Sequence, residues 1–187
     1  EASCNGLVFI PSTDYVAVLE HGDVHIWNGI SGNYLHELKN PPALSNSASF
    51  LLQNKVSRAC SYQVLRVSKN GKYLLAADRH NWRISVWSTS TWDLISTIET
   101  GYSHIEFSDD GKFIVVINSS ACKIWESNTG SYVRTLDGEE FYPTTVAISS
   151  ENQFVAAAGI GEFRLWNLQT GQLLEQSNWH GSSVRIY

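Results

Sequence analysis

A four-residue run of an apolar, a polar and an apolar residue followed by Trp recurs four times along the chain, ending at Trp27, Trp87, Trp125 and Trp166. The last three of these tryptophans are spaced at about forty residues, a period typical of strand repeats. Apolar residues on either side of a polar one indicate a strand with one buried face. The chain is therefore predicted to be a repeating array of short strands.

Each Trp is followed five residues later by a turn residue. Three units have Gly32, Gly130 or Gly171 there, and Gly permits the positive φ of a tight turn. The second unit has Trp92 instead. An apolar residue then begins a further strand, so strands are expected over 33–38, 93–98, 131–136 and 172–177.

Two more strand-like runs precede each Trp. The dipeptides Asn70-Gly71 and Asp110-Gly111 stand between such runs and are strong hairpin signals. Each unit is therefore predicted to be a four-stranded antiparallel meander. One such sheet cannot bury both of its faces, so neighbouring sheets must stack. Stacked four-stranded sheets with this period predict an all-β fold, the β-propeller.

The units resemble WD40 repeats. The resemblance rests on Ser108-x-Asp110-Gly111-Lys112, on strands that end in Ile-Trp, and on Thr-Gly in the following turn. It covers nearly the whole chain apart from residues 39–61. The repeats are degenerate, because the family's Asp after Trp is replaced in every unit and its buried Asp, six residues before Trp, is His21, Asn81, Ser119 or Ile160 here. Packing between the units is therefore expected to rest mostly on apolar contacts.

The chain is interpreted as a single propeller fragment. Blade 1 is placed at about 6–38, an insertion at 39–61, blade 2 at about 62–98, blade 3 at about 103–136, blade 4 at about 144–177, and the first strand of a fifth blade at about 180–187. Propellers usually have four to eight blades. We therefore expect part of a larger ring of about seven blades, completed by further sequence or by another polypeptide; a closed ring of four is the alternative.

Composition bounds the class of protein. With 187 residues, 43% of them hydrophobic, the chain is long enough for a sizeable core. It has no apolar run of the roughly 18 residues that a membrane-spanning helix needs. The three cysteines are widely spaced, which favours free thiols in a reducing compartment, and Cys122 takes a core position on a strand. An intracellular location, cytoplasmic or nuclear, is therefore expected.

Residues 55–83 form a basic segment in a chain whose net charge is −5. Asp78 is its single acidic residue, and its seven basic residues are Lys55, Arg58, Arg66, Lys69, Lys72, Arg79 and Arg83. The loops of a meander alternate between two edges, which places Lys55, Arg58 and Arg79 on one edge beside His80 and Trp82, and Lys69 and Lys72 on the other. Such an edge is expected to attract an acidic protein or RNA. The alternative is an ordinary solvated surface, and a pI near 5.6 argues against a dedicated nucleic-acid binder.

The loop before blade 4 contains Phe141 and Tyr142. Exposed aromatic residues in a loop can anchor a protein partner. The alternative is that these side chains pack as a staple over the neighbouring blade.

Catalytic and metal-binding patterns do not emerge. His21 and His25 are four residues apart, which on one strand separates them by roughly 13 Å, too far for one metal ion. No metal, cofactor or enzymatic activity is therefore expected. The resemblance implies a non-enzymatic scaffold that gathers protein partners within a larger assembly. The alternatives are a subunit of a ribonucleoprotein particle, which contacts RNA through the basic segment, and a sensor region of a larger signalling NTPase.

Overall fold

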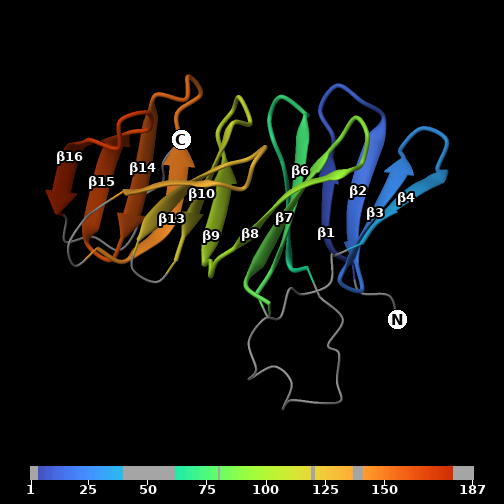
Figure 1. Ribbon diagram of the computed structural model, residues 1–187, viewed down its shortest axis with the longest axis horizontal. Helices are drawn as coiled ribbons and strands as arrows, with labels where there is room; N and C mark the ends of the chain where they lie inside the picture. The colour runs from blue at the N-terminus through green and yellow to red at the C-terminus, as the bar shows by residue number, and fades with distance from the viewer. Residues whose placement is uncertain (1–3, 40–61, 80, 119–120, 137–140, 179–187) are drawn as a thin grey trace, which may run out of the picture.

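The computed structural model describes residues 4–39, 62–79, 81–118, 121–136 and 141–178, and these are all-β, with no helix among them (Figure 1). Sheet 1 contains β1 (Cys4–Phe9), β2 (Tyr15–Glu20), β3 (Asp23–Asn28) and β4 (Tyr34–Leu38). Sheet 2 contains β5 (Val64–Val67), β6 (Tyr73–Asp78), β7 (Arg83–Ser88) and β8 (Leu94–Glu99). Sheet 3 contains β9 (His104–Phe107), β10 (Phe113–Ile117), β11 (Cys122–Glu126) and β12 (Tyr132–Leu136). Sheet 4 contains β13 (Pro143–Ile148), β14 (Phe154–Gly159), β15 (Glu162–Asn167) and β16 (Leu173–Asn178).

All four sheets are antiparallel meanders with their strands in sequence order, which confirms the predicted four-stranded units. The predicted insertion and the predicted start of a fifth blade lie outside the described residues, apart from Lys39. No helix in the described part of the chain is long and apolar enough to cross a membrane.

The four tryptophans of the repeat occupy the same place on the third strand of each sheet. Trp27 pairs with Tyr34, Trp87 with Leu94, Trp125 with Tyr132 and Trp166 with Leu173, each directly after a register shift. Trp87 and Trp166 are buried, whereas Trp27 and Trp125 are half-buried. The glycines five residues after three of them have φ between 68° and 74°, and Trp92 adopts the same left-handed conformation with φ 64°.

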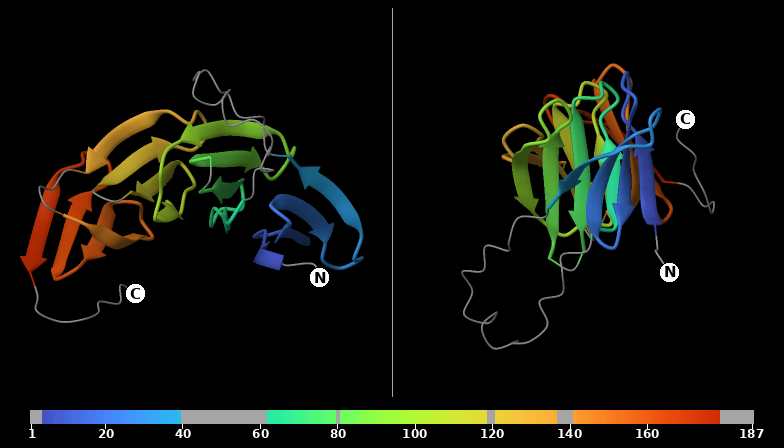
Figure 2. Two further views of the ribbon diagram at one scale, coloured as in Figure 1. Left: turned by 90° about the horizontal axis from the view of Figure 1, so that it is seen from below. Right: turned by 90° about the vertical axis from the view of Figure 1, so that its right-hand side faces the viewer.

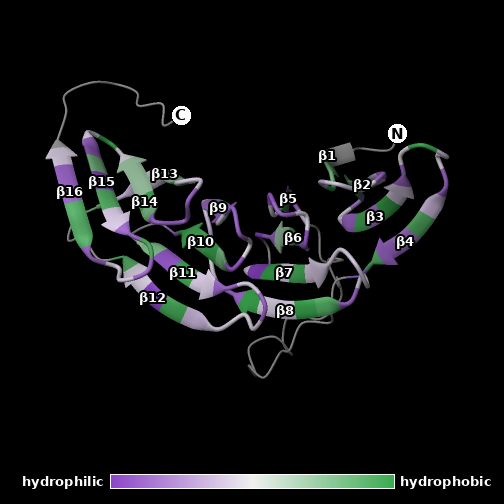
Figure 3. Cartoon of the chain, turned by 90° about the horizontal axis from the view of Figure 1, so that it is seen from above, coloured by the Kyte–Doolittle hydropathy of each residue, from purple (hydrophilic) through white to green (hydrophobic). Residues whose placement is uncertain are grey.

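The sheets follow one another along an open arch, with sheet 1 and sheet 4 at its two ends (Figure 2). Seen from above, the first strand of each sheet lies on the inside of the arch and the fourth strand on the outside (Figure 3). Neighbouring sheets contact each other through their first strands, β1 with β5, β5 with β9 and β9 with β13. No contact closes the row into a ring among the described residues.

Three apolar cores fill the three junctions between neighbouring sheets. Leu19 and Ile26 of sheet 1 lie in one core with Leu65 and Trp87 of sheet 2. The next two junctions repeat this arrangement with residues of equivalent position, and Cys122 is buried in the last of them. At the positions of the family's buried Asp, His21 and Ile160 are exposed, so apolar contact is the main packing term, as the degenerate repeats predict.

Candidate functional site

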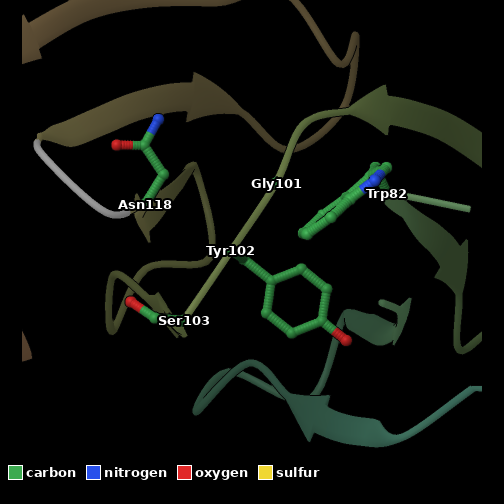
Figure 4. A pocket seen from close by; sticks show the side chains of 5 residues that line it. All are labelled: Trp82, Gly101, Tyr102, Ser103 and Asn118. Carbon is green, nitrogen blue, oxygen red and sulfur yellow. The ribbon is translucent and has the colours of Figure 1, made fainter. Parts of the chain in front are cut away.

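A pocket of about 430 Å³ opens where sheets 2 and 3 meet, and it is the candidate site (Figure 4). Its lining comes from three separate segments: the β6–β7 turn, the β8–β9 connection and the end of β10. The lining residues are Trp82, Gly101, Tyr102, Ser103 and Asn118. We call the edge of the sheets that carries these segments the pocket edge.

Trp82 presents its indole to solvent from a constrained backbone. The side chain is 56% exposed and φ is 53°, a left-handed conformation that costs an L-residue about 1–2 kcal/mol. Two contacts hold the turn: the Asn81 amide nitrogen Nδ2 donates to the buried Asp78 carboxylate at 2.7 Å, and the Thr100 N–H donates to the Trp82 carbonyl at 2.8 Å. The exposed indole is therefore fixed in place by its neighbours.

Gly101 provides the flat surface beside this indole. A Cβ at residue 101 would lie 3.1 Å from Cε3 and 3.3 Å from Cζ3 of Trp82. Figure 4 shows the ring next to the chain at Gly101, with the Tyr102 ring on the same side. The absence of a side chain at residue 101 thus lets the indole form one wall of the pocket.

Tyr102 and Arg79 make up the adjoining wall. Tyr102 is 5% exposed, and the Arg79 guanidinium lies 5.4 Å from its ring centroid, within reach of a cation–π interaction. Arg79 also donates from Nη2 to the Ser103 carbonyl at 3.3 Å. Burial raises the pKa of Tyr102 to about 12, although the Arg79 charge opposes the rise, so the phenol is neutral at physiological pH. It cannot act there as a base.

Ser103 and Asn118 line the other side of the Gly101–Ser103 segment from Trp82 (Figure 4). The Ser103 N–H donates to the Ile117 carbonyl at 2.7 Å, and the Asn118 side-chain oxygen accepts from the Ala121 N–H at 3.0 Å. Next along β9, burial and the Arg66 charge lower the pKa of His104, which favours a neutral imidazole. The pocket therefore combines an aromatic wall with polar backbone-held groups and one exposed cation, Arg79.

The structure brings together two of the residues predicted for an interaction edge, Arg79 and Trp82. Lys55, Arg58 and His80 lie outside the described residues. Lys72 and Arg79 flank opposite ends of β6, so Lys69 and Lys72 stand on the edge away from the pocket. There Lys69 forms an ion pair with Asp109 at 2.5 Å, and Arg83 is buried with its Nη2 3.5 Å from Glu99. The basic segment is thus less free in charge than its composition suggests.

Phe141 and Tyr142 separate into two environments. Phe141 is buried in the core between sheets 3 and 4, with its ring centroid 5.8 Å from that of Trp166 and the Arg164 guanidinium 4.7 Å away. This corresponds to the staple alternative, because a buried ring offers a partner no surface. Tyr142 is 61% exposed. It is the member of the pair that an incoming partner can reach.

Gly101, Tyr102, Ser103 and Asn118 are absent from the residues predicted for the site. One signal in the sequence marks Tyr102: an aromatic residue stands two positions before the first strand in Tyr62, Tyr102 and Phe141. All three are buried at a junction between sheets. The residues around Tyr102 are therefore the connection between two sheets, where loops from both can meet.

Metal and catalytic constellations were sought in the same way. The described residues hold no group of three His, Cys, Asp or Glu side chains placed to bind a metal ion. Cys122 lies in the core rather than in the pocket, and burial raises its pKa to about 12. The chemistry that the pocket offers is contact and hydrogen bonding.

Comparison with known proteins adds to the fold alone. No family model and no curated protein matches the chain. Among solved structures, hydrazine synthase of Kuenenia stuttgartiensis is similar, with a TM-score of 0.67 at 17% sequence identity. The match covers 97% of this chain and 50% of that one, so the chain spans half the length of this structural neighbour. The likeness supports an all-β fold of blade-like sheets.

Proposed function

We propose that this chain is a non-enzymatic protein-interaction scaffold that binds a segment of a partner protein in the pocket beside Trp82. The observation that carries the proposal is the indole itself: it is more than half exposed, yet a left-handed backbone and two hydrogen-bonded contacts fix it at the wall of a pocket. Rigid exposed aromatics of this kind dominate the binding energy of protein interfaces. A larger multiprotein assembly inside the cell, cytoplasmic or nuclear, is the setting we infer.

The fold proposal is that the four sheets are blades of a WD40-like β-propeller. Three things support it: the common period, the meander of every sheet, and the arch in which first strands line the inside. In such a fold the loops at the two edges carry the binding surfaces. The pocket edge, with Trp82 and the Gly101–Ser103 segment, is then one of these surfaces.

The chemistry of the pocket favours a peptide over a reacting substrate. An apolar or aromatic side chain fits between the Trp82 indole and the neighbouring segment, and Arg79 is suited to a carboxylate beside it. Tyr102, with its raised pKa, supplies no general base. A short extended segment with an apolar anchor and an acidic neighbour is the ligand that we expect.

A phage-displayed library of random peptides, selected on the purified chain, tests this function. We expect selected peptides to lose at least about tenfold in affinity for Trp82→Ala, since truncating an interface hot spot costs 2 kcal/mol or more. Tyr142→Ala is the matched control, because it removes an equally exposed aromatic residue from a different junction. Selected peptides that bind Trp82→Ala as tightly as the unmodified chain would refute the assignment.

The proximity of Arg79 to an exposed Trp also favours a second candidate, contact with RNA. Aromatic side chains stack on unpaired bases while cations contact the phosphates. A single-stranded RNA whose affinity falls steeply with salt, and falls further in Arg79→Ala, would support it. The pairing of Lys69 with Asp109 and the burial of Arg83 leave few free cations for this role, so we rank it second.

A further inference from the structure

Sheet 1 exposes a face that its counterparts bury. Leu7 pairs with Val18, and the equivalent first-strand residues of the other sheets are Leu65, Ile105 and Val146. Leu7 is 53% exposed, whereas those three residues are 3%, 2% and 5% exposed because the preceding sheet covers them. Phe9, on the same strand, is 70% exposed. The described residues therefore leave the Trp-bearing face of sheet 1 without a neighbour.

The turn after Trp27 leads to the same conclusion. A Cβ at Gly130 would lie 3.1 Å from the Ser96 Cβ of the preceding sheet, and one at Gly171 would lie 2.8 Å from the Arg134 Cδ. Nothing lies within 4 Å of a Cβ at Gly32, the equivalent residue of sheet 1. In both internal cases the fourth strand of the preceding sheet fills this space, and at Gly32 the space is open.

Sheet 4 exposes the opposite, complementary face. Phe163 and Leu165 on β15 are half-buried, whereas the equivalent pairs Ile84 with Val86 and Cys122 with Ile124 are fully buried by the following sheet. Phe163 and Leu165 line an apolar groove of about 340 Å³ together with Ala156 and Phe154. In the three internal junctions, residues at these positions contact the Trp-bearing face of the next sheet.

We propose that the groove on sheet 4 binds the Trp-bearing face of sheet 1 of a second copy of this chain. The contact would repeat, between molecules, a junction that occurs three times within the molecule, which is why we choose a second copy as the occupant. Leu7 and Phe9 of one copy would enter the groove beside Leu165 of the other. Glu175, which pairs with Leu165 as Ser96 pairs with Val86, would meet the Gly32 turn.

The geometry makes this contact head-to-tail. The two faces are different surfaces at opposite ends of the arch, so one copy can use both at once (Figure 2). Such heterologous contacts close into a ring when the rotation fits and continue into longer assemblies when it does not. Two copies joined at both ends would stack eight sheets, within the range of four to eight for closed rings of this type.

Light scattering of the purified chain after size-exclusion chromatography tests the proposal, with two charged variants. Leu7→Asp blocks the face of sheet 1, and Leu165→Asp blocks the groove of sheet 4. We expect the unmodified chain to have at least twice the 20.9 kDa mass of one chain, and each variant alone to have the mass of one. Mixing the two variants should restore a species of twice that mass, because each retains the face that the other lacks. Val133→Asp, an exposed apolar position on the outer strand of the internal sheet 3, is the matched control and should assemble like the unmodified chain.

Each outcome decides the matter. A monomeric unmodified chain would overturn the proposal, and so would a Leu7→Asp variant that still self-associates, since that would mean contact between two identical faces. Folded variants that do not recombine on mixing would overturn it as well. A thermal melt of each variant establishes that it is folded; if Leu165→Asp does not melt cooperatively, Phe163→Lys on the same face replaces it in the mixture.

Discussion

Trp92 packs its indole on His36 of the preceding sheet, with the ring centroids 5.7 Å apart and an interplanar angle of 38°. In the next two junctions the residue at this turn position is Gly130 or Gly171, and the neighbouring strand closes directly over the glycine. The second sheet thus fills with a side chain the space that the third and fourth sheets close by approach of the backbone. The same left-handed turn therefore serves two kinds of junction.

Replacing Trp92 with Gly should destabilise the fold slightly. The change relieves about 1–2 kcal/mol of left-handed strain. It also removes packing against His36 and Tyr15, which for a half-buried aromatic we put at about half of the roughly 3–5 kcal/mol lost when a buried one is truncated. We expect a net loss of about 1 kcal/mol in the free energy of unfolding, measured by urea denaturation.

Gly130→Trp is the reciprocal control for that experiment. Its Cβ would lie 3.1 Å from both the Ser96 Cβ and the Thr97 carbonyl oxygen, so the junction must open to admit the ring. A loss clearly larger than that of Trp92→Gly is expected, on the order of several kcal/mol. If Trp92→Gly stabilises the chain, or if both variants behave alike, the two junctions are not packed as described.

Gly101→Ala should disturb the pocket without disturbing the fold. The new methyl group would meet the Trp82 ring at 3.1 Å, and the exposed indole can move away more easily than the buried chain. We expect peptides that bind the pocket to lose about tenfold in affinity, as isothermal titration would measure. The free energy of unfolding should change by less than about 1 kcal/mol, because Gly101 does not need a left-handed backbone.

Gly6→Ala serves as the control for the pocket. A Cβ there meets Leu65 and Leu19 at ordinary contact distances of 3.7 and 3.8 Å, away from Trp82. Peptide affinity should be unchanged in this variant. Equal weakening by both alanine variants would mean that the effect arises from general loosening rather than from the indole.

The local pattern predicts the sheets well because each unit carries its own signals. The alternation before each Trp and the Asn70-Gly71 and Asp110-Gly111 turns depend on neighbours in sequence, and the strands appear within a few residues of where these signals place them. Tyr62 is an informative miss: it was expected to begin a strand, yet it turns into the core, its ring centroid 5.6 Å from that of Trp87. Phe141 was considered for the surface for the same reason, since burial at a junction depends on the adjacent sheet.

The site was predicted only in part. Arg79 and Trp82 follow from the alternation of loops between the two edges. Gly101, Ser103 and Asn118 became lining residues because the β8–β9 connection passes beside a turn of another strand pair, a contact that no local pattern encodes. The same holds for Arg83, whose burial and pairing with Glu99 depend on the third and fourth strands lying together.

Cys122 should make stability fall in alkaline solution. Burial raises the pKa of its thiol from 9.0 to about 12, so the folded state keeps the proton that the unfolded state releases. The stabilisation is therefore fully present below about pH 9 and is lost as pH rises toward 12, by up to about 1.4 kcal/mol per pH unit. Cys122→Ala should flatten this slope in urea titrations, and the remaining slope will contain the contribution of Tyr102, whose pKa is raised in the same direction. A thiol reagent that modifies the native chain readily at about pH 8 would contradict the burial of the thiol.

The charge of Arg79 should act mainly on association with an acidic partner. Arg79→Glu reverses an exposed charge beside the pocket and should slow the binding of a glutamate-rich peptide by about tenfold at low salt, with a smaller effect on dissociation. The difference should nearly vanish at about 1 M salt, where the screening length is roughly 3 Å. Lys69→Glu is the control, because Lys69 lies on the opposite edge and is paired with Asp109. Stopped-flow measurements of both variants across salt concentrations separate the two edges. Equal effects of the two reversals would show that only the net charge of the chain matters, and the recognition of partners would then rest on the Trp82 indole alone.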